Sequence, residues 1–142
     1  MIFRNLPQIV RLAQRVGAAV ENAVMRFPRY HKYSIGADLR ADGRLVIRSA
    51  VRAWRESGQR LERVREFAAA IDQLKDSMQL GKDVNAFGSF REFEAVARLV
   101  NELGARCGGW LNSVAKGQNG KASAPAQRAQ ILSSRVAHEA IP

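Results

Sequence analysis

The sequence of 142 residues contains a single cysteine, Cys107, and only two histidines, His31 and His138. One cysteine cannot form a disulfide within the chain, which agrees with a reducing compartment. No Cys-x-x-Cys or His-Glu-x-x-His motif is present, and no glycine loop of the phosphate-binding type. The sequence therefore predicts no metal site, no cofactor and no catalytic centre.

A long apolar run is also missing. Near the N-terminus the apolar positions are interrupted by Arg4, Arg11 and Arg15, a pattern unlike that of a secretory signal peptide. The longest uncharged runs fall far short of the roughly 18 residues that a membrane-spanning helix needs. We therefore expect a cytoplasmic protein that does not cross a membrane.

Acidic residues are scarce relative to basic ones. The 13 Asp and Glu stand against 23 Lys and Arg, so the net charge is +10. Such a charge indicates an anionic partner: nucleic acid, an acidic protein or an anionic membrane surface. The apolar content of 46% is ordinary for a globular chain and sufficient for a single core.

Apolar residues recur at a spacing of three or four along most of the chain, and no alternating strand pattern is visible. This period predicts helices over residues 7–26, 34–56, 59–80 and 90–115. Pro28 ends the first helix, and Ser34 is the expected N-cap of the second. Gly81 is the expected C-cap of the third helix, and Ser89 with Glu92 forms a capping box for the fourth.

Helices of this length joined by short links predict an all-α fold, an antiparallel up-down four-helix bundle. We assign residues 1–116 to this domain. From Gly117 the composition shifts to Gly, Ser, Ala, Gln and Asn, so residues 117–142 are predicted to form a flexible C-terminal tail. Residues 126–140 could form a weak helix on a partner.

Arginines follow one another along the predicted second helix at spacings of four, four, four and three: Arg40, Arg44, Arg48, Arg52 and Arg55. In a helix this spacing produces one stripe that drifts by about 40° per step. Only Arg52 has an acidic residue at helical spacing, Glu56. The positive charge of the stripe is therefore not neutralised within its own helix.

The arginine stripe has two interpretations. It is either a solvated face whose arginine stems cover apolar surface, or a surface that contacts phosphates or an acidic partner. We favour the second, because the predicted fourth helix offers a contrast in its alternating ladder of Glu94, Arg98, Glu102 and Arg106. The same binding role is predicted for cations on the first helix and at the junction after it: Arg11, Arg15, Arg26, Arg29 and Lys32. Tyr30 and Tyr33 add aromatic rings suited to base stacking at that junction.

Asp38 and Asp42 form a carboxylate pair without a basic residue at helical spacing. The pair is either a metal or general-acid pair, or it makes a salt link to another helix or another subunit. We favour the salt link. Cys107 lies on the apolar stripe of its helix, which is typical of a buried, inert thiol rather than a nucleophile.

Two adjacent glycines, Gly108 and Gly109, stand inside the predicted fourth helix, where they cost roughly 2 kcal/mol relative to alanines. Close approach by another helix or subunit, anchored by Trp110, would compensate for this cost. Fraying of the helix end is the alternative. We assign Trp110, Gly108, Gly109, Asp38 and Asp42 to an oligomer interface.

The Phe27-Pro28 junction and the segment 104–110, which ends in Gly-Gly-Trp, resemble the accessory variability determinant proteins of diversity-generating retroelements. The resemblance covers about residues 7–116. It implies a four-helix bundle that assembles into a cyclic homo-pentameric barrel and is not an enzyme. It also implies binding to the reverse transcriptase and to template RNA, in support of mutagenic complementary DNA synthesis.

The family likeness does not assign individual binding residues, so the arginines are predicted from the charge pattern alone. Bundle proteins encoded within ribosomal RNA intervening sequences share the implied fold. A free-standing basic bundle that binds nucleic acid is therefore the alternative function. A small bundle enzyme is a third, against which the missing ligands and acid–base pairs argue.

Overall fold

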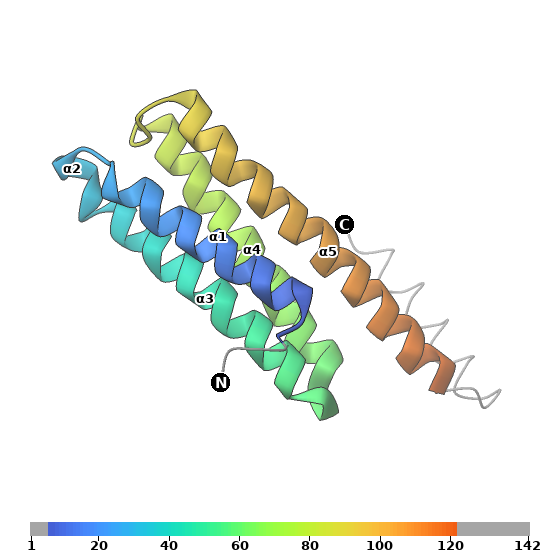
Figure 1. Cartoon of the computed structure of the whole chain (residues 1–142). Helices are drawn as coiled ribbons and strands as arrows, with labels where there is room; N and C mark the ends of the chain where they lie inside the picture. The colour runs from blue at the N-terminus through green and yellow to red at the C-terminus, as the bar shows by residue number, and fades with distance from the viewer. Residues whose placement is uncertain (1–5, 122–142) are drawn as a thin grey trace, which may run out of the picture.

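The computed structural model describes residues 6–121, and within that range all regular secondary structure is helical (Figure 1). The predicted all-α class is thereby confirmed. The elements are α1 (Gln8–Met25), α2 (Arg29–Lys32), α3 (Ile35–Arg55), the 3-10 turn η1 (Ser57–Gln59), α4 (Arg60–Asp83) and α5 (Phe90–Lys121). The four long helices pack as a bundle, in which α3 contacts α1 and α4, and α5 contacts α4 and α1.

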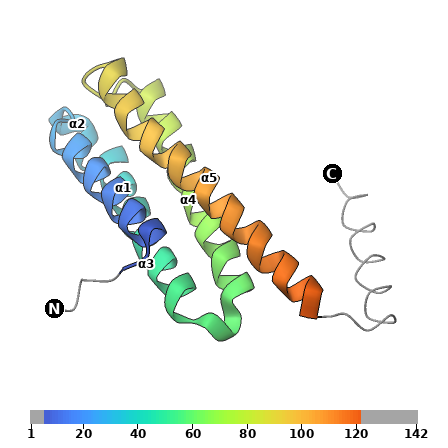
Figure 2. The same ribbon diagram turned by 45° about the vertical axis from the view of Figure 1, so that its right-hand side comes forward.

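Short α2 lies at one end of the bundle, close to the loop between α4 and α5 (Figures 1 and 2). The end of α1 and the start of α3 flank α2 in the chain. We call this the α2 end. The turn η1, the end of α3 and the start of α1 lie toward the opposite end (Figure 2).

The core is built from the apolar stripes that the sequence predicts. It is dominated by small and β-branched side chains, with Phe67 as the largest fully buried one. Phe27, at the predicted junction, is 4% exposed and packs edge-on against Phe87 with ring centroids 5.0 Å apart. The proline-broken junction is thus fixed by an aromatic contact with the α4–α5 loop.

Glycines let α1 and α3 approach closely. A Cβ added at Gly17 would collide with the end of the Ile47 side chain, and one at Gly36 would lie 2.9 Å from Val24 Cγ1 and 3.1 Å from the carbonyl oxygen of His31. A Cβ added at Gly43 would lie 3.7 Å from the Cα atom of Gly17, so these two glycines face each other. Gly43 is therefore a packing position rather than only a weak point of its helix.

The helix α2 follows Pro28 and was not expected, because four residues are too few to show a period. Ser34 does stand at the N-cap of α3, but it makes no side-chain capping bond. Its Oγ donates instead to the carbonyl oxygens of Tyr30 at 3.2 Å and His31 at 3.4 Å, and so closes α2.

The end of α4 differs from the prediction. The helix continues past Gly81 to Asp83, and Asn85 takes the left-handed conformation with φ of 59°. Asn85 N–H donates to the carbonyl oxygen of Lys82, and Ala86 N–H donates to that of Gly81, which is the Schellman pattern. Gly81 is buried, and a Cβ there would lie 3.0 Å from the ring of Phe87.

The capping box of α5 is confirmed in its first half. Ser89 Oγ accepts from the N–H of Glu92 at 3.2 Å, while the Glu92 carboxylate accepts from the N–H of Gly88 at 3.1 Å. The helix then runs to Lys121, so the expected end near residue 115 is wrong. A lone glycine such as Gly117 costs only about 1 kcal/mol, which good helix formers around it can offset. The rest of the predicted tail, residues 122–142, lies outside the described residues.

Between residues 6 and 121, no helix is both long enough and apolar enough to cross a membrane.

Candidate nucleic-acid interface

The arginine stripe crosses the outer face of α3 obliquely. Each step of four residues turns by about 40°, so Arg40 and Arg52 are separated by about 120° around the helix. Arg40 contacts Glu21 of α1, whereas Arg52 contacts Glu66 of α4. The stripe therefore begins beside α1, crosses the exposed face of α3 and reaches α4 at Arg52. The last step, of three residues, turns Arg55 back by about 60°.

Glu21 of α1 partly neutralises the first part of the stripe, although no acidic residue of α3 does so. Its two carboxylate oxygens accept from Arg40 Nε at 3.1 Å and from Arg44 Nη2 at 3.3 Å. These partners are 19 and 23 residues away in the sequence, so a search within one helix does not reveal them. One carboxylate serves two guanidinium groups, and Arg44 stays 63% exposed.

The last part of the stripe has mixed surroundings. Arg52 donates to Glu56 at 2.9 Å, as its spacing predicts, and this hydrogen bond lowers the pKa of Glu56. Arg55 lies over the ring of Trp54 at 5.9 Å, a cation–π arrangement that leaves its charge unneutralised. Arg48 is exposed and has no carboxylate within 4.0 Å among the described residues.

Among the predicted binding residues, four arginines of α1 and α3 are exposed and have no carboxylate within 4.0 Å among the residues that the structure describes, and we call them the open arginines: Arg11, Arg15, Arg48 and Arg55. Arg29, Arg65 and Arg91 meet the same two criteria elsewhere on the molecule. Gly17 of α1 packs beside Gly43 and Ile47 of α3. Gly36, at the start of α3, lies against Val24, at the end of α1. The two contacts together place the N-terminal part of α1 alongside the C-terminal part of α3. The open arginines thus share the half of the bundle that lies away from α2.

The predicted cations at the junction lie at the α2 end. Arg26 is bound to Glu92 of α5 at 3.5 Å and is 68% exposed, so its charge is partly neutralised. Arg29 is exposed and Lys32 is half-buried, both on α2 beside the exposed ring of Tyr30. These cations and the open arginines form two separate groups, which the sequence alone presents as one.

The ladder on α5 is neutralised as predicted. Arg98 donates to Glu94 at 2.7 Å, and Arg106 lies 3.5 Å from Glu102. Arg106 also donates to the side-chain oxygen of Gln8 at 3.4 Å. The ladder therefore provides a control surface of the same residue type with its charge cancelled.

The hydrogen-bond partners of Asp42 contradict the predicted salt link. It is 6% exposed and accepts hydrogen bonds from Gln73 Nε2 at 2.7 Å and from Ser77 Oγ, both on α4. Its partners are neutral donors of the same chain, so Asp42 is not available to an oligomer interface. Asp38, one turn earlier, is exposed, and its carboxylate has no hydrogen-bond partner among the described residues.

Trp110 packs partly against the core of its own chain. Its ring meets Phe67 edge-on with centroids 6.3 Å apart, and it lines a cavity of about 620 Å³ together with Trp54, Arg60 and Arg106. Gly108 and Gly109 are exposed, and a Cβ added at either would have nothing within 4 Å among residues 6–121. Fraying is excluded as their explanation, because α5 continues through both.

Cys107 is confirmed as a buried thiol. It is 1% exposed, and burial, with a smaller effect of the Asp72 charge, raises its pKa to about 11. In residues 6–121 no three His, Cys, Asp or Glu side chains come together as a possible metal site.

Comparisons with known proteins do not assign a family. The chain matches no protein-family model, and no curated protein matches it significantly.

Proposed function

We propose that this protein is a non-catalytic accessory subunit of a diversity-generating retroelement. In this role it binds the reverse transcriptase and the template RNA during mutagenic complementary DNA synthesis. The observation that carries the binding part is the set of open arginines, whose charge no described carboxylate neutralises. The retroelement context rests on the resemblance of the Phe27-Pro28 junction and of residues 104–110.

Phosphate is the ligand that these side chains suit best. A guanidinium group presents several donors in a plane and keeps its charge at any relevant pH. Contacts of this kind position a nucleic acid without reading its sequence. An acidic surface of the polymerase would engage the same donors.

The proposal includes an antiparallel up-down bundle that assembles into a homo-pentameric ring. A ring repeats the open arginines on every subunit, which strengthens the field and speeds the encounter with a polyanion. The exposed Gly108-Gly109 pair supports an interface between copies, because no described residue packs closely on it.

Two double variants of equal charge change test the binding surface. Arg48→Gln with Arg55→Gln removes two open arginines, and Arg98→Gln with Arg106→Gln removes two neutralised ones. Binding to labelled single-stranded RNA should weaken about tenfold or more in the first variant and little in the second. The slope of log affinity against log salt should fall by about 1.4 in the first, or about 0.7 for each phosphate that an arginine no longer neutralises.

Equal decreases in affinity in the two variants would mean that only net charge matters, and the assignment of the open arginines would be wrong. Arg11→Gln with Arg15→Gln extends the test to α1. Circular dichroism and light scattering should show unchanged helicity and mass in all three, because exposed substitutions usually cost under about 0.5 kcal/mol each.

A free-standing basic bundle that binds nucleic acid is the alternative function. The gene neighbourhood separates the two. A reverse transcriptase gene beside a near-duplicate pair of template and variable repeats supports the retroelement role, and its absence supports the free-standing one.

A further inference from the structure

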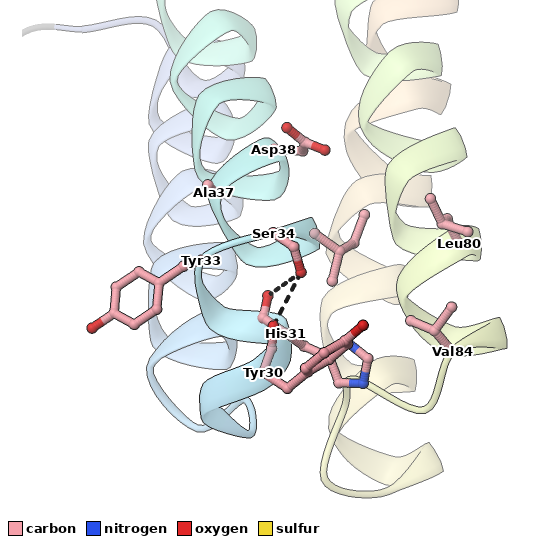
Figure 3. Close-up of a pocket in the computed structure, with 9 residues that line it drawn as sticks. Tyr30, His31, Tyr33, Ser34, Ala37, Asp38, Leu80 and Val84 are labelled. Carbon is pink, nitrogen blue, oxygen red and sulfur yellow. Dashed lines mark hydrogen bonds between the residues drawn. The ribbon is translucent and has the colours of Figure 1, made fainter.

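A groove of about 480 Å³ lies at the α2 end, between α2 and the start of α3 on one side and the end of α4 on the other (Figure 3). Tyr30 and His31 form its floor, and Leu80 and Val84 form the α4 wall (Figure 3). Tyr30 is 85% exposed, and Leu80 and Val84 are exposed as well. The groove is therefore an accessible apolar surface that includes an aromatic face.

One carboxylate faces this surface, which the polar side chains of His31 and Ser34 also line. The Asp38 carboxylate projects from α3 into the space between α3 and α4 (Figure 3), and no donor among the described residues reaches it. Asp42, one turn further along the same face, receives two donors from α4. At the level of Asp38, α4 presents Leu80 instead, so no described side chain of α4 donates to this carboxylate.

We propose that this groove binds a guanine base of single-stranded RNA. The inference rests on the RNA-binding function proposed above and gives it a base preference. The base would stack on Tyr30, as single-stranded bases commonly do on aromatic side chains. Its N1–H and 2-amino group would donate together to the Asp38 carboxylate, which accepts through both oxygens.

Guanine is favoured because it alone among the four bases offers two adjacent donors on its pairing edge. Adenine and cytosine each place an acceptor nitrogen beside the amino group, and uracil flanks its N–H with two carbonyl oxygens. An acceptor held against a carboxylate is repelled. The same chemistry lets acidic side chains select bases by their donors elsewhere.

The surroundings suit a nucleic-acid strand. Arg29 and Lys32 stand on α2 close to Tyr30 in the chain, outside the lining of the groove, and supply positive charge at this end for contacts with the phosphates of a bound strand. Tyr33 also borders the groove, but its ring, 74% exposed, points away from it (Figure 3). The base stacking expected of this ring from the sequence therefore does not extend to the groove, and Tyr33 serves as a control.

Fluorescence anisotropy with labelled single-stranded RNA tests the proposal on the full chain. The probes are an all-uridine strand and the same strand with one central guanosine, inosine or adenosine. We expect the guanosine strand to bind at least about fivefold more tightly than the uridine and adenosine strands, the lower limit for a bidentate contact. Inosine, which lacks the 2-amino group, should bind with intermediate affinity.

The variant Asp38→Asn should remove the guanosine preference while leaving affinity for the uridine strand equal or higher, because a negative charge is removed. Asp83→Asn is the matched control, since Asp83 is an exposed carboxylate near the same end that accepts from Gln79 and does not line the groove. Tyr30→Ala should weaken binding of the guanosine strand, and Tyr33→Ala should not.

Binding without base preference, or a preference that survives Asp38→Asn, would overturn the groove assignment and leave the open arginines untouched. No binding to any strand would instead overturn the proposed RNA binding. A third outcome is that Asp38→Asn weakens binding to purified reverse transcriptase and leaves RNA selection unchanged. The groove would then hold a basic side chain of that protein, and the guanine proposal would be wrong.

Methyl NMR gives a readout independent of the arginines. Guanosine monophosphate should shift the Leu80 and Val84 methyl signals, and uridine monophosphate should not. Equal shifts with both nucleotides would contradict guanine selection.

Discussion

Two groups of helical glycines in this bundle have opposite surroundings. At the crossing of α1 and α3, a Cβ added to Gly17 or Gly36 would press on neighbouring atoms. On α5, a Cβ added to Gly108 or Gly109 would meet nothing within 4 Å. Each glycine inside a helix costs about 1 kcal/mol relative to alanine.

The difference shows at which glycines packing within the chain offsets the helix-propensity cost of glycine. Gly17 and Gly36 are offset by the close packing of α1 on α3. Gly108 and Gly109 have no such compensation among the described residues. A second copy packed on α5 would supply it, in line with the proposed ring.

The largest effect is expected at the α1–α3 crossing. Gly36→Leu should destabilise the fold by about 3 kcal/mol, because its Cβ would lie 3.1 Å from a backbone carbonyl that cannot move aside. Thermal unfolding should shift down by roughly 10 to 20 °C. A shift of only one or two degrees would show that α1 and α3 can separate freely, and the comparison would fail.

The double variant Gly108→Ala with Gly109→Ala should change the free energy of unfolding in the opposite direction. In dilute solution it should stabilise the folded chain by about 1 to 2 kcal/mol, since two good helix formers replace two poor ones without a clash. Chemical denaturation measures this gain. If another copy packs closely on α5, the same variant should lower the mass found by light scattering at higher concentration.

An unchanged oligomer in the alanine double variant would remove these glycines from the interface. A monomeric wild-type protein at micromolar concentration would refute the ring itself.

A smaller effect is expected for Gly43→Ala. Its Cβ would sit 3.6 Å from Val20, an ordinary contact, so the helix-propensity gain should dominate by less than about 1 kcal/mol. Parallel denaturation of Gly17→Ala would sharpen the comparison, because that Cβ needs the Ile47 side chain to move.

The alanine double variant should leave the thiol reactivity of Cys107 in the folded state unchanged, because Cys107 faces the core while its neighbour Gly108 faces outward. With its pKa raised to about 11 by burial, the thiol stays protonated at pH 8. A thiol reagent should leave it unlabelled in the folded state of both the wild type and the alanine double variant, and should label it only after unfolding. Faster labelling of the variant would mean that α5 has shifted on the core.

The helices were predictable because their signals are local. The period of apolar residues lies within each helix, and Pro28 ends α1 through its own ring. The predicted C-terminal end of α4 was wrong, because Asn85 rather than Gly81 adopts the left-handed conformation. Gly81 serves a contact with Phe87 that only the folded chain creates.

The site was less predictable because its decisive contacts join separate helices. Glu21 of α1 forms ion pairs with Arg40 and Arg44 of α3, and spacing rules within a single helix cannot predict these pairs. The same limit applies to Asp42, whose donors are 31 and 35 residues away. The unneutralised state of Arg48, by contrast, follows from the sequence and holds among the described residues.

The buried Asp42 also determines how α3 and α4 align along their length. Valine and alanine dominate this core, and such side chains are similar enough that one helix could slide along another by a turn at modest cost. A slide of one turn, about 5.4 Å, would take Asp42 away from Gln73 and Ser77 and leave its carboxylate buried without donors. The pair of neutral donors thus selects a single register, and with it the depth of the groove that Asp38 faces.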